Sequence, residues 1–320
     1  MGKLLIELGS DIQVCLQTNA AEIISYWERL LEGWVRPFEE GVEPDISLTF
    51  ELVDQLPERP AAAPIFVDEH AFYEQDLGNL EVYAGETADS LILYFRNGGL
   101  VEVSRARPLR AHGYVNRKLL LSSRFEDALF TTLAPLLRRC GLFVIHAFGA
   151  SVDGQGVLIV GPSGSGKTTT GLRLVLDGWS LLSNDGVAYA KRPEGVYGFP
   201  TPGLVSIRPH SFELLPELNE FVNQERFAHE KDKAFLPAQR VARERWSTAV
   251  PLRRIYFPRI EDREDCYLKP LHRAVGLALL MEESVDRWDA AVLGEHVAVL
   301  QGLTEQTELY TLHLGRDISR

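Results

Sequence analysis

The strongest chemical signal in the sequence is the segment from Gly161 to Thr168, which reads Gly-Pro-Ser-Gly-Ser-Gly-Lys-Thr. This G-x-x-x-x-G-K-T spacing is typical of a phosphate-binding loop, because glycines allow backbone angles that turn successive N–H groups toward a phosphate. Lys167 would neutralise the β- and γ-phosphates, and the Thr168 hydroxyl would ligate Mg²⁺. The pattern predicts nucleotide phosphate binding, with a structural glycine turn as the alternative.

The residues on either side of this segment have the patterns of a strand and a helix. An apolar, β-branched run at residues 157–160 precedes the glycines, and an amphipathic stretch at residues 171–179 follows them. A phosphate-binding loop connects a strand to a helix in this way. We expect the nucleotide to be bound by the loop and the first turn of the helix: Gly161, Pro162, Ser163, Gly164, Ser165, Gly166, Lys167, Thr168 and Thr169.

A carboxylate for the metal ion is expected at the end of a neighbouring strand. Residues 179–183 form a short predicted strand that ends in Asn184-Asp185-Gly186. We therefore expect Thr168 and Asp185 to be the metal ligands, with ATP and Mg²⁺ as the cofactors. The alternative for this tripeptide is a hairpin turn, in which such residues are common.

The composition excludes several classes of protein. A formal charge of −12 and a pI near 5.2 argue against binding to nucleic acid or to an anionic membrane, because clustered Lys and Arg hold phosphate backbones. The sequence has no apolar leader and no run of about 18 apolar residues, so we expect a cytoplasmic protein. Cys15, Cys140 and Cys266 have no C-x-x-C pairing, so we expect buried, reduced thiols.

A chain of 320 residues is long enough for two domains. We expect a β-rich α+β N-terminal domain at residues 1–120, which would serve as a scaffold or for recognition. Asn97-Gly98 is the strongest short hairpin signal in the chain. The expected strands of this domain are residues 3–8, 12–16, 46–53, 80–83, 90–96 and 99–104, and its expected helix is residues 20–31.

We expect a nucleotide-binding α/β domain at residues 121–320. A capping pattern beginning at Ser122 opens a predicted helix that ends at Gly141, and a further helix at residues 273–283 is expected to be the last element. The other expected strands are residues 142–146, 148–152, 187–191 and 252–258, and residues 198–203 are expected to form a rigid turn.

A histidine and a glycine turn precede the phosphate-binding motif. His146 is expected on a strand that leads to Gly154 and Gly156, which come shortly before Gly161. In this pattern, residues 125–189 resemble the C-terminal catalytic domain of HPr kinase/phosphorylase, a family that is itself similar to phosphoenolpyruvate carboxykinase. The resemblance implies an α/β fold with an HPr kinase/phosphoenolpyruvate carboxykinase-like, P-loop domain in the C-terminal part of the chain.

The resemblance also implies the catalytic residues His146, Lys167, Asn184 and Asp185. The family has two adjacent aspartates after the loop lysine, of which the first is a catalytic acid/base and the second a magnesium ligand. Asn184 and Asp185 occupy those places. An amide cannot accept a hydroxyl proton at neutral pH, so the usual general base is missing unless His146 substitutes for it.

A second departure from the family lies after the expected turn. The family carries a signature like Leu-Glu-Ile-Arg-Gly, and the matching residues 205–209 keep Arg208 but have Ser206 in place of the acidic residue. We expect Arg208 to face phosphate. The turn at residues 198–203 would either wall the nucleotide site or connect two strands.

The resemblance implies an ATP-binding kinase that moves the γ-phosphate of Mg-ATP to a hydroxyl of a peptide, protein or small molecule. Diverged relatives of this kind occur in peptide-modification cassettes such as SynChlorMet. The alternative function is therefore that of a nucleotide-binding regulatory or scaffold protein of such a cassette, with weak or no kinase activity. The family also implies a possible homo-oligomer. The acceptor and the choice of ATP over GTP stay open.

Two further features of the sequence bear on this choice. A transport ATPase of the ABC type shares the glycine-rich motif, but the chain has no L-S-G-G-Q segment and Asp185 follows Lys167 too soon. Residues 211–250 carry many charges, which we expect to form mostly a solvated face, with one Arg or Lys closing over the γ-phosphate.

Overall fold

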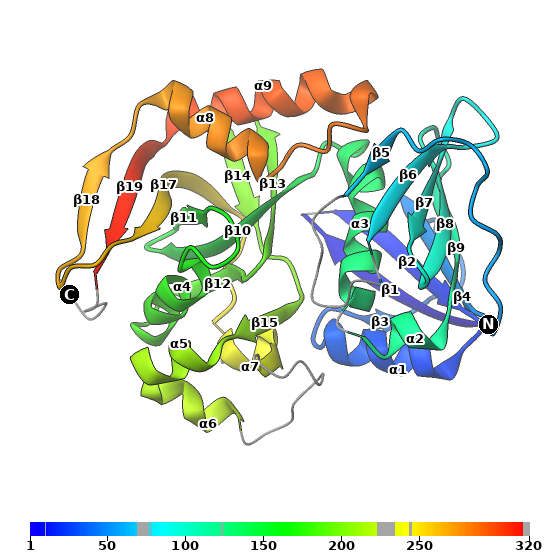
Figure 1. Cartoon of the computed structure of the whole chain (residues 1–320), viewed down its shortest axis with the longest axis horizontal. Helices are drawn as coiled ribbons and strands as arrows, with labels where there is room; N and C mark the ends of the chain where they lie inside the picture. Colours follow the sequence, from blue (N-terminus) through cyan, green and yellow to red (C-terminus); the bar gives the residue numbers. More distant parts are fainter. Residues whose placement is uncertain are drawn as a thin grey trace. The chain divides into compact units, whose positions relative to one another are not determined.

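The structure, a computed structural model, describes residues 1–9, 11–68, 77, 79–122, 124–222, 234–242 and 245–315. The chain forms two compact units, Met1–Cys140 and Gly141–Arg320. Both are mixed α/β structures built on large sheets (Figure 1). The division lies 20 residues after the expected boundary at residue 120, because helix α3 (Arg124–Arg138) packs against strands of the first unit. No helix in the described ranges is both long and apolar enough to span a bilayer.

The described part of the first unit holds one nine-stranded sheet in the order β3-β1-β2-β4-β9-β8-β7-β6-β5. Strands β2, β4 and β9 run parallel to their neighbours in this group, and the remaining pairs are antiparallel. Helix α1 makes the crossover that the parallel pair β2–β4 requires. The elements are β1 Gly2–Leu8, β2 Ile12–Thr18, α1 Ala21–Leu30, β3 Arg36–Pro37, β4 Ile46–Leu52, β5 Phe66–Val67, β6 Leu80–Ala84, β7 Ser90–Phe95, β8 Gly99–Ser104, β9 Leu109–Val115, α2 Arg117–Leu120 and α3.

Aromatic residues fill the contact between helices and sheet in the first unit. Trp27 on α1 and Phe50 on β4 are fully buried, and Phe125 at the start of α3 lies 5.8 Å from Phe50 between ring centroids. Tyr26 meets Phe125 edge to face at 4.9 Å. Because α3 places Phe125 against α1 and β4, the helix belongs to this core.

The second unit is built around an eight-stranded sheet in its described part. The main order is β11-β10-β13-β14-β17-β19-β18, with β12 paired to β10. Strand β11 also pairs with β17, so β11, β10, β13, β14 and β17 close a ring of hydrogen-bonded strands. The strands are β10 Phe143–Val152, β11 Gln155–Val160, β12 Ser180–Ser183, β13 Gly186–Arg192, β14 Gly195–Phe199, β17 Val250–Ile260, β18 Tyr267–Pro270 and β19 Glu308–Leu314.

Helices cover both faces of this sheet. Val157 and Ile159 on β11 pack with helix α4 on one face, whereas Leu158 and Val160 pack with α8 and α9 on the other. Alternation with a period of two residues produces this division. The remaining elements are α4 Lys167–Leu176, β15 Leu204–Ile207, α5 Pro209–Leu214, a 3₁₀ turn Pro216–Leu218, α6 Asn219–Val222, β16 Ala234–Pro237, α7 Ala238–Ala242, α8 Arg273–Glu282 and α9 Ala290–Gln306.

Several sequence-based expectations for this unit were wrong. The two strands expected at residues 142–146 and 148–152 are one strand, β10, with a register shift at Gly149/Ala150. The turn expected at residues 198–203 begins inside β14, which carries Gly198 and Phe199. Helix α8 is followed by α9 and by β19, so it is not the last element. The apolar pattern of α8 is local, so it carries no information about a later strand that returns to the sheet.

Two other expectations meet the structure only in part. Cys15 is buried as expected, but Cys140 and Cys266 are partly exposed, and none of the three forms a disulfide. Most of the charged residues expected to form a solvated face lie at residues 223–233 and 243–244, outside the described residues. Arg240 and Arg245 are described and are only partly exposed.

Candidate functional site

Two strand ends meet at one edge of the second unit's sheet. Strands β11 and β12 pair antiparallel with opposite sides of β10, since Gly149 faces Leu158 on one side and Ser183 on the other. Strands β11 and β12 therefore run in the same direction. The loop that begins at Gly161 and the pair Asn184-Asp185 consequently leave the sheet at the same edge, with β10 between them.

The glycine-rich loop (residues 161–166) ends at the N-terminus of helix α4. Gly164 has φ = 84° and Gly166, the N-cap of α4, has φ = 100°, which is a region that side chains rarely tolerate. No side chain caps the helix, and the buried Ser165 Oγ has no hydrogen-bond partner in the described residues. The first amides of a helix lack intrahelical partners, so this geometry fits an anion.

Lys167, the first residue of α4, is folded back into the glycine-rich loop. Its side chain is only 6% exposed, and its Nζ donates to the carbonyl oxygens of Gly161 (2.5 Å) and Pro162 (3.1 Å). Burial lowers the pKa of Lys167, and the nearby carboxylates of Asp185 and Glu283 oppose that shift. The loop thus holds a buried cation where the sequence predicts phosphate binding.

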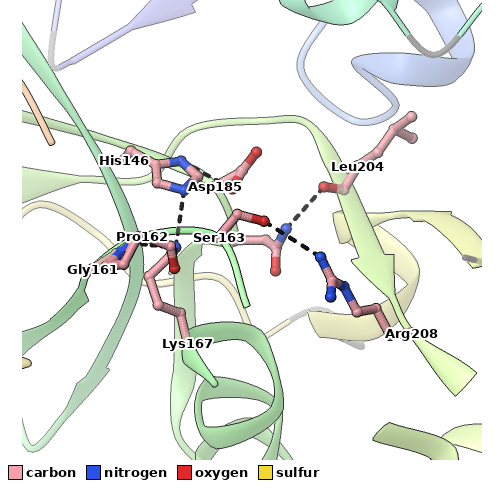
Figure 2. A network of polar contacts seen from close by, with 9 residues as sticks. His146, Gly161, Pro162, Ser163, Lys167, Asp185, Leu204 and Arg208 are labelled. Atoms are coloured by element: carbon pink, nitrogen blue, oxygen red, sulfur yellow. Dashed lines mark hydrogen bonds and ion pairs between the residues drawn. The ribbon is translucent and has the colours of Figure 1, made fainter. Parts of the chain in front are cut away.

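His146 links Lys167 to Asp185 (Figure 2). Lys167 Nζ lies 2.9 Å from His146 Nε2, and His146 Nδ1 lies 3.2 Å from Asp185 Oδ1. An ammonium group only donates, so with Lys167 charged Nε2 must accept, and the imidazole proton is then on Nδ1 facing the carboxylate. The structure therefore brings three of the four expected catalytic residues into one chain of contacts.

Asn184, the fourth expected catalytic residue, is turned toward the protein interior. It is 4% exposed, and its Nδ2 donates to the carbonyl oxygen of Leu204 at 3.2 Å. Its Oδ1 is buried without a hydrogen-bond partner in the described part of the chain. This amide ties the end of β12 to the start of β15, and the donor that it uses is one that an ionised aspartate lacks.

The expected metal ligands differ in exposure. The Asp185 side chain is 65% exposed, and Thr168 is partly buried in the first turn of α4. In the described residues no cluster of three or more His, Cys, Asp or Glu side chains could hold a metal ion. Mg²⁺ at nucleotide sites usually takes one or two protein oxygens and completes its shell with phosphate and water, so Thr168 and Asp185 fit that kind of ligation.

The hairpin alternative for Asn184-Asp185-Gly186 is wrong. Strands β12 and β13 both pair with β10 rather than with each other.

Thr169 is the last of the residues expected to bind the nucleotide. Its Oγ1 lies 2.7 Å from Ser211 Oγ, so this hydroxyl connects α4 to α5.

Arg208 reaches the glycine-rich loop at Ser163, as Figure 2 shows. Its Nη2 is 3.4 Å from Ser163 Oγ, and a Cβ added at Gly164 would be 3.8 Å from its Nη1. Arg208 is exposed and follows β15, which places a second cation at the glycine-rich loop. Ser206, the residue that departs from the family signature, lies in β15 and pairs with Phe235.

The sequence did not reveal the role of the segment after α8. The backbone N–H of His146 donates to the carbonyl oxygen of Glu283 (2.9 Å), and Ser284 Oγ donates to the Val144 carbonyl oxygen (2.9 Å). Ser284 Oγ also meets His296 Nε2 at 2.8 Å. These partly buried contacts fix β10 beside the site, and Glu283 adds a carboxylate near Lys167. No motif marks these residues, since they form the site only after α8 has folded onto β10.

Comparison with known proteins finds HPr kinase/phosphorylases. The chain is 34% identical over 106 residues to the enzyme of Geobacillus sp. (strain WCH70), which is 33% of this chain and 32% of that protein. It is 46% identical over 57 residues to the enzyme of Streptococcus salivarius, 18% of each chain. Over these segments the chain is similar to HPr kinase/phosphorylase, from which it has diverged. No family model matches it.

The match to these curated relatives spans about a third of their length or less. Among solved structures, the Hpr(Ser) kinase/phosphatase of Coxiella burnetii aligns with 54% of this chain and 85% of that chain, at 10% identity and a TM-score of 0.27. A TM-score of that size supports no argument about function.

The position of Asn184 generates a prediction about stability. Asn184→Asp should lower the free energy of unfolding by about 1–3 kcal/mol at neutral pH, because a buried carboxylate would face the Leu204 carbonyl oxygen. The loss should shrink at acidic pH, because a protonated carboxyl group can donate to that oxygen. Denaturant unfolding measures both effects.

The neighbouring exposed residue provides the control for this experiment. Asp185→Asn is the reverse substitution, in which an amide replaces a carboxylate. It should change the free energy of unfolding by no more than about 0.5 kcal/mol, because Asp185 is exposed. An Asn184→Asp protein as stable as wild type at neutral pH would show that the hydrogen bond from the Asn184 amide to Leu204 does not contribute to stability.

Proposed function

We propose that this chain is an ATP-binding phosphotransferase similar to HPr kinase, with a P-loop domain in its second unit. It moves the γ-phosphate of Mg-ATP to a hydroxyl group of a peptide, protein or small molecule. The observation that carries the proposal is the chain of contacts from the glycine-rich loop through Lys167 and His146 to Asp185. A cation, a proton acceptor and a carboxylate at the N-terminus of one helix suit phosphoryl transfer.

The residues divide the chemistry among them. The amides at the start of α4 and the Lys167 ammonium bind the phosphates, and Arg208 neutralises charge from the other side of the loop. Thr168 and Asp185 hold Mg²⁺, which supplies charge neutralisation when it is bound. As the acceptor oxygen bonds to the γ-phosphorus and the β–γ bridge breaks, the hydroxyl proton passes to Nε2 of His146.

His146 becomes available as the base when Lys167 turns to the phosphates. In the structure, Nε2 of His146 accepts from Lys167, so its lone pair is engaged. A lysine that contacts phosphate releases that lone pair, while Asp185 Oδ1 stays 3.2 Å from the other ring nitrogen. The same event would thus bind the donor and prepare the proton acceptor.

The second candidate function is a nucleotide-binding regulatory or scaffold protein of a peptide-modification cassette. The observation that favours it is Asn184, whose amide is committed to Leu204 and cannot act as a base. Under this alternative the chain binds ATP at the same loop as the proposed phosphotransferase does, but transfers phosphate slowly or not at all.

Nucleotide binding is tested at Lys167. Lys167→Ala should weaken binding of Mg-ATP by more than tenfold, because the phosphates lose a charged hydrogen-bond donor and each ~1.4 kcal/mol corresponds to a factor of ten. Isothermal titration calorimetry measures the change. Lys191→Ala, which removes an exposed lysine on β13, is the control and should bind as wild type does. Wild-type affinity in a folded Lys167→Ala protein would rule out phosphate binding at the loop.

Metal binding is tested at Asp185. Asp185→Asn should reduce the gain in ATP affinity that Mg²⁺ provides, because an amide oxygen is a weaker ligand for a hard cation than a carboxylate. ATP is titrated with and without Mg²⁺, and the ratio of the two affinities should fall toward one. Asp153→Asn, at the exposed turn between β10 and β11, should keep the wild-type ratio. An unchanged ratio at Asp185 would remove it from the metal site.

Transfer activity separates the kinase from the regulatory protein. Radiolabelled ATP is incubated with a cell lysate or with free serine, and labelled products are counted. His146→Ala should reduce transfer by about 10²- to 10⁴-fold, as loss of a general base does, while ATP affinity changes less than tenfold. A wild-type protein that binds Mg-ATP but labels nothing would favour the regulatory function. Full activity in the His146→Ala protein would place the base elsewhere.

A further inference from the structure

The two sides of strand β11 differ in chemistry. Leu158 on β11 pairs with Gly149 of β10 on one side and with Ile255 of β17 on the other. His146 and Asp185 lie on the β10 side. If these groups face the γ-phosphate, as in the proposed function, the rest of the nucleotide extends from the loop toward the β17 side.

Three parallel strands end together on that second side. Strand β17 runs parallel to both β11 and β19, so the carboxyl ends of all three strands lie at one edge of the sheet. Ile260 is the last residue of β17 and pairs with Leu314, the last residue of β19. The start of helix α4 rests on this pair, because a Cβ added at Gly166 would lie 2.7 Å from Leu314 Cδ1 and 4.0 Å from Ile260 Cγ1.

Ile260 is apolar and exposed beside the start of α4. Its exposed fraction is 63%, although it extends toward the helix that begins the proposed nucleotide site. Leu314, its partner in the strand pair, is 7% exposed. The exposed side chain of Ile260 therefore offers an apolar contact beside the helix end that the proposed function assigns to phosphate.

The surroundings of Ile260 are rigid. Glu261 Oε1 contacts His313 Nδ1 at 2.6 Å, and the His313 ring stacks on Tyr267 at 4.2 Å with an interplanar angle of 3°. These contacts join the ends of β17, β18 and β19. A surface held in this way needs little ordering when it binds a ligand, which favours affinity.

We infer that Ile260 and the adjoining end of β17 form the nucleobase subsite of this chain. The inference rests on the proposed nucleotide binding, and it names the side of the loop that the base occupies. The base covers the exposed face of Ile260, with its phosphates on the amides of α4. The contact is apolar and comes from a planar ring, so it contributes to affinity for nucleotides but not for inorganic phosphates.

The test compares ATP with inorganic tripolyphosphate, which carries the same phosphate chain without a nucleoside. Ile260→Ser should weaken Mg-ATP binding about three- to tenfold, because a buried apolar contact of ~1 kcal/mol is lost. Tripolyphosphate affinity should change less than twofold. Ile260→Leu, which keeps the apolar surface, should bind ATP nearly as wild type does.

A matched control uses an exposed apolar residue on the other face of the sheet. Val275 on α8 is 48% exposed, and α8 packs in the core opposite α4. Val275→Ser should leave both affinities unchanged. Because Ile260 is exposed, its replacement by serine should not prevent folding, and the thermal midpoint of each variant without ligand checks this.

Each outcome decides the inference. A selective loss of ATP affinity in Ile260→Ser, restored in Ile260→Leu, supports it. Equal weakening of ATP and tripolyphosphate, or no weakening of either, overturns it. If wild type binds tripolyphosphate as tightly as ATP, the base makes no contact and the subsite is wrong, but the phosphate loop stands. If wild type binds neither ligand, the proposed function fails together with the inference.

Discussion

The buried ammonium group of Lys167 is the constraint on which the candidate site depends. A charged side chain at 6% exposure needs hydrogen-bond partners, and this one finds them in the carbonyl oxygens of Gly161 and Pro162 and in His146 Nε2. These contacts hold the loop closed around the cation and fix the orientation of the imidazole. Burial lowers the pKa of Lys167, and the negative charges of Asp185 and Glu283 oppose that shift.

Strand β10 gives this arrangement its frame. Its first half faces β13 and positions His146, and its second half pairs with β11 and β12 on opposite sides. The close approach of α4 depends on Gly171, where a Cβ would lie 2.2 Å from the Phe148 ring of β10. One strand therefore sets the distance between the loop helix, the imidazole and the carboxylate. The segment at Glu283 and Ser284 binds two of its backbone groups, the His146 N–H and the Val144 carbonyl oxygen.

The local parts of the site could be predicted from the sequence, whereas the distant parts could not. The strand before Gly161 and the helix after Gly166 have their own periodicity and turn residues, so their patterns are visible in a short window. Asp185 could be expected near the loop because it follows a predicted strand. Glu283 and Ile260 reach the same site from elements more than 70 residues away along the chain, through β10 and β17, and no local pattern records such pairings. The missed strand β19 has the same cause, because its partner β17 lies before two helices.

The closed ring of strands has a consequence for the motions available to the loop. Strand β11 has a hydrogen-bonded neighbour on each side, and each neighbour is itself joined through β13 and β14 to the other. Fraying begins at free edges and chain ends, and β11 has neither. Amide hydrogens of β11 should therefore exchange with solvent only when the whole unit opens, whereas those of the edge strand β18 should exchange much sooner. Any rearrangement around a ligand must then take place in the loop and in the first turn of α4, with the strand beneath them as a fixed base.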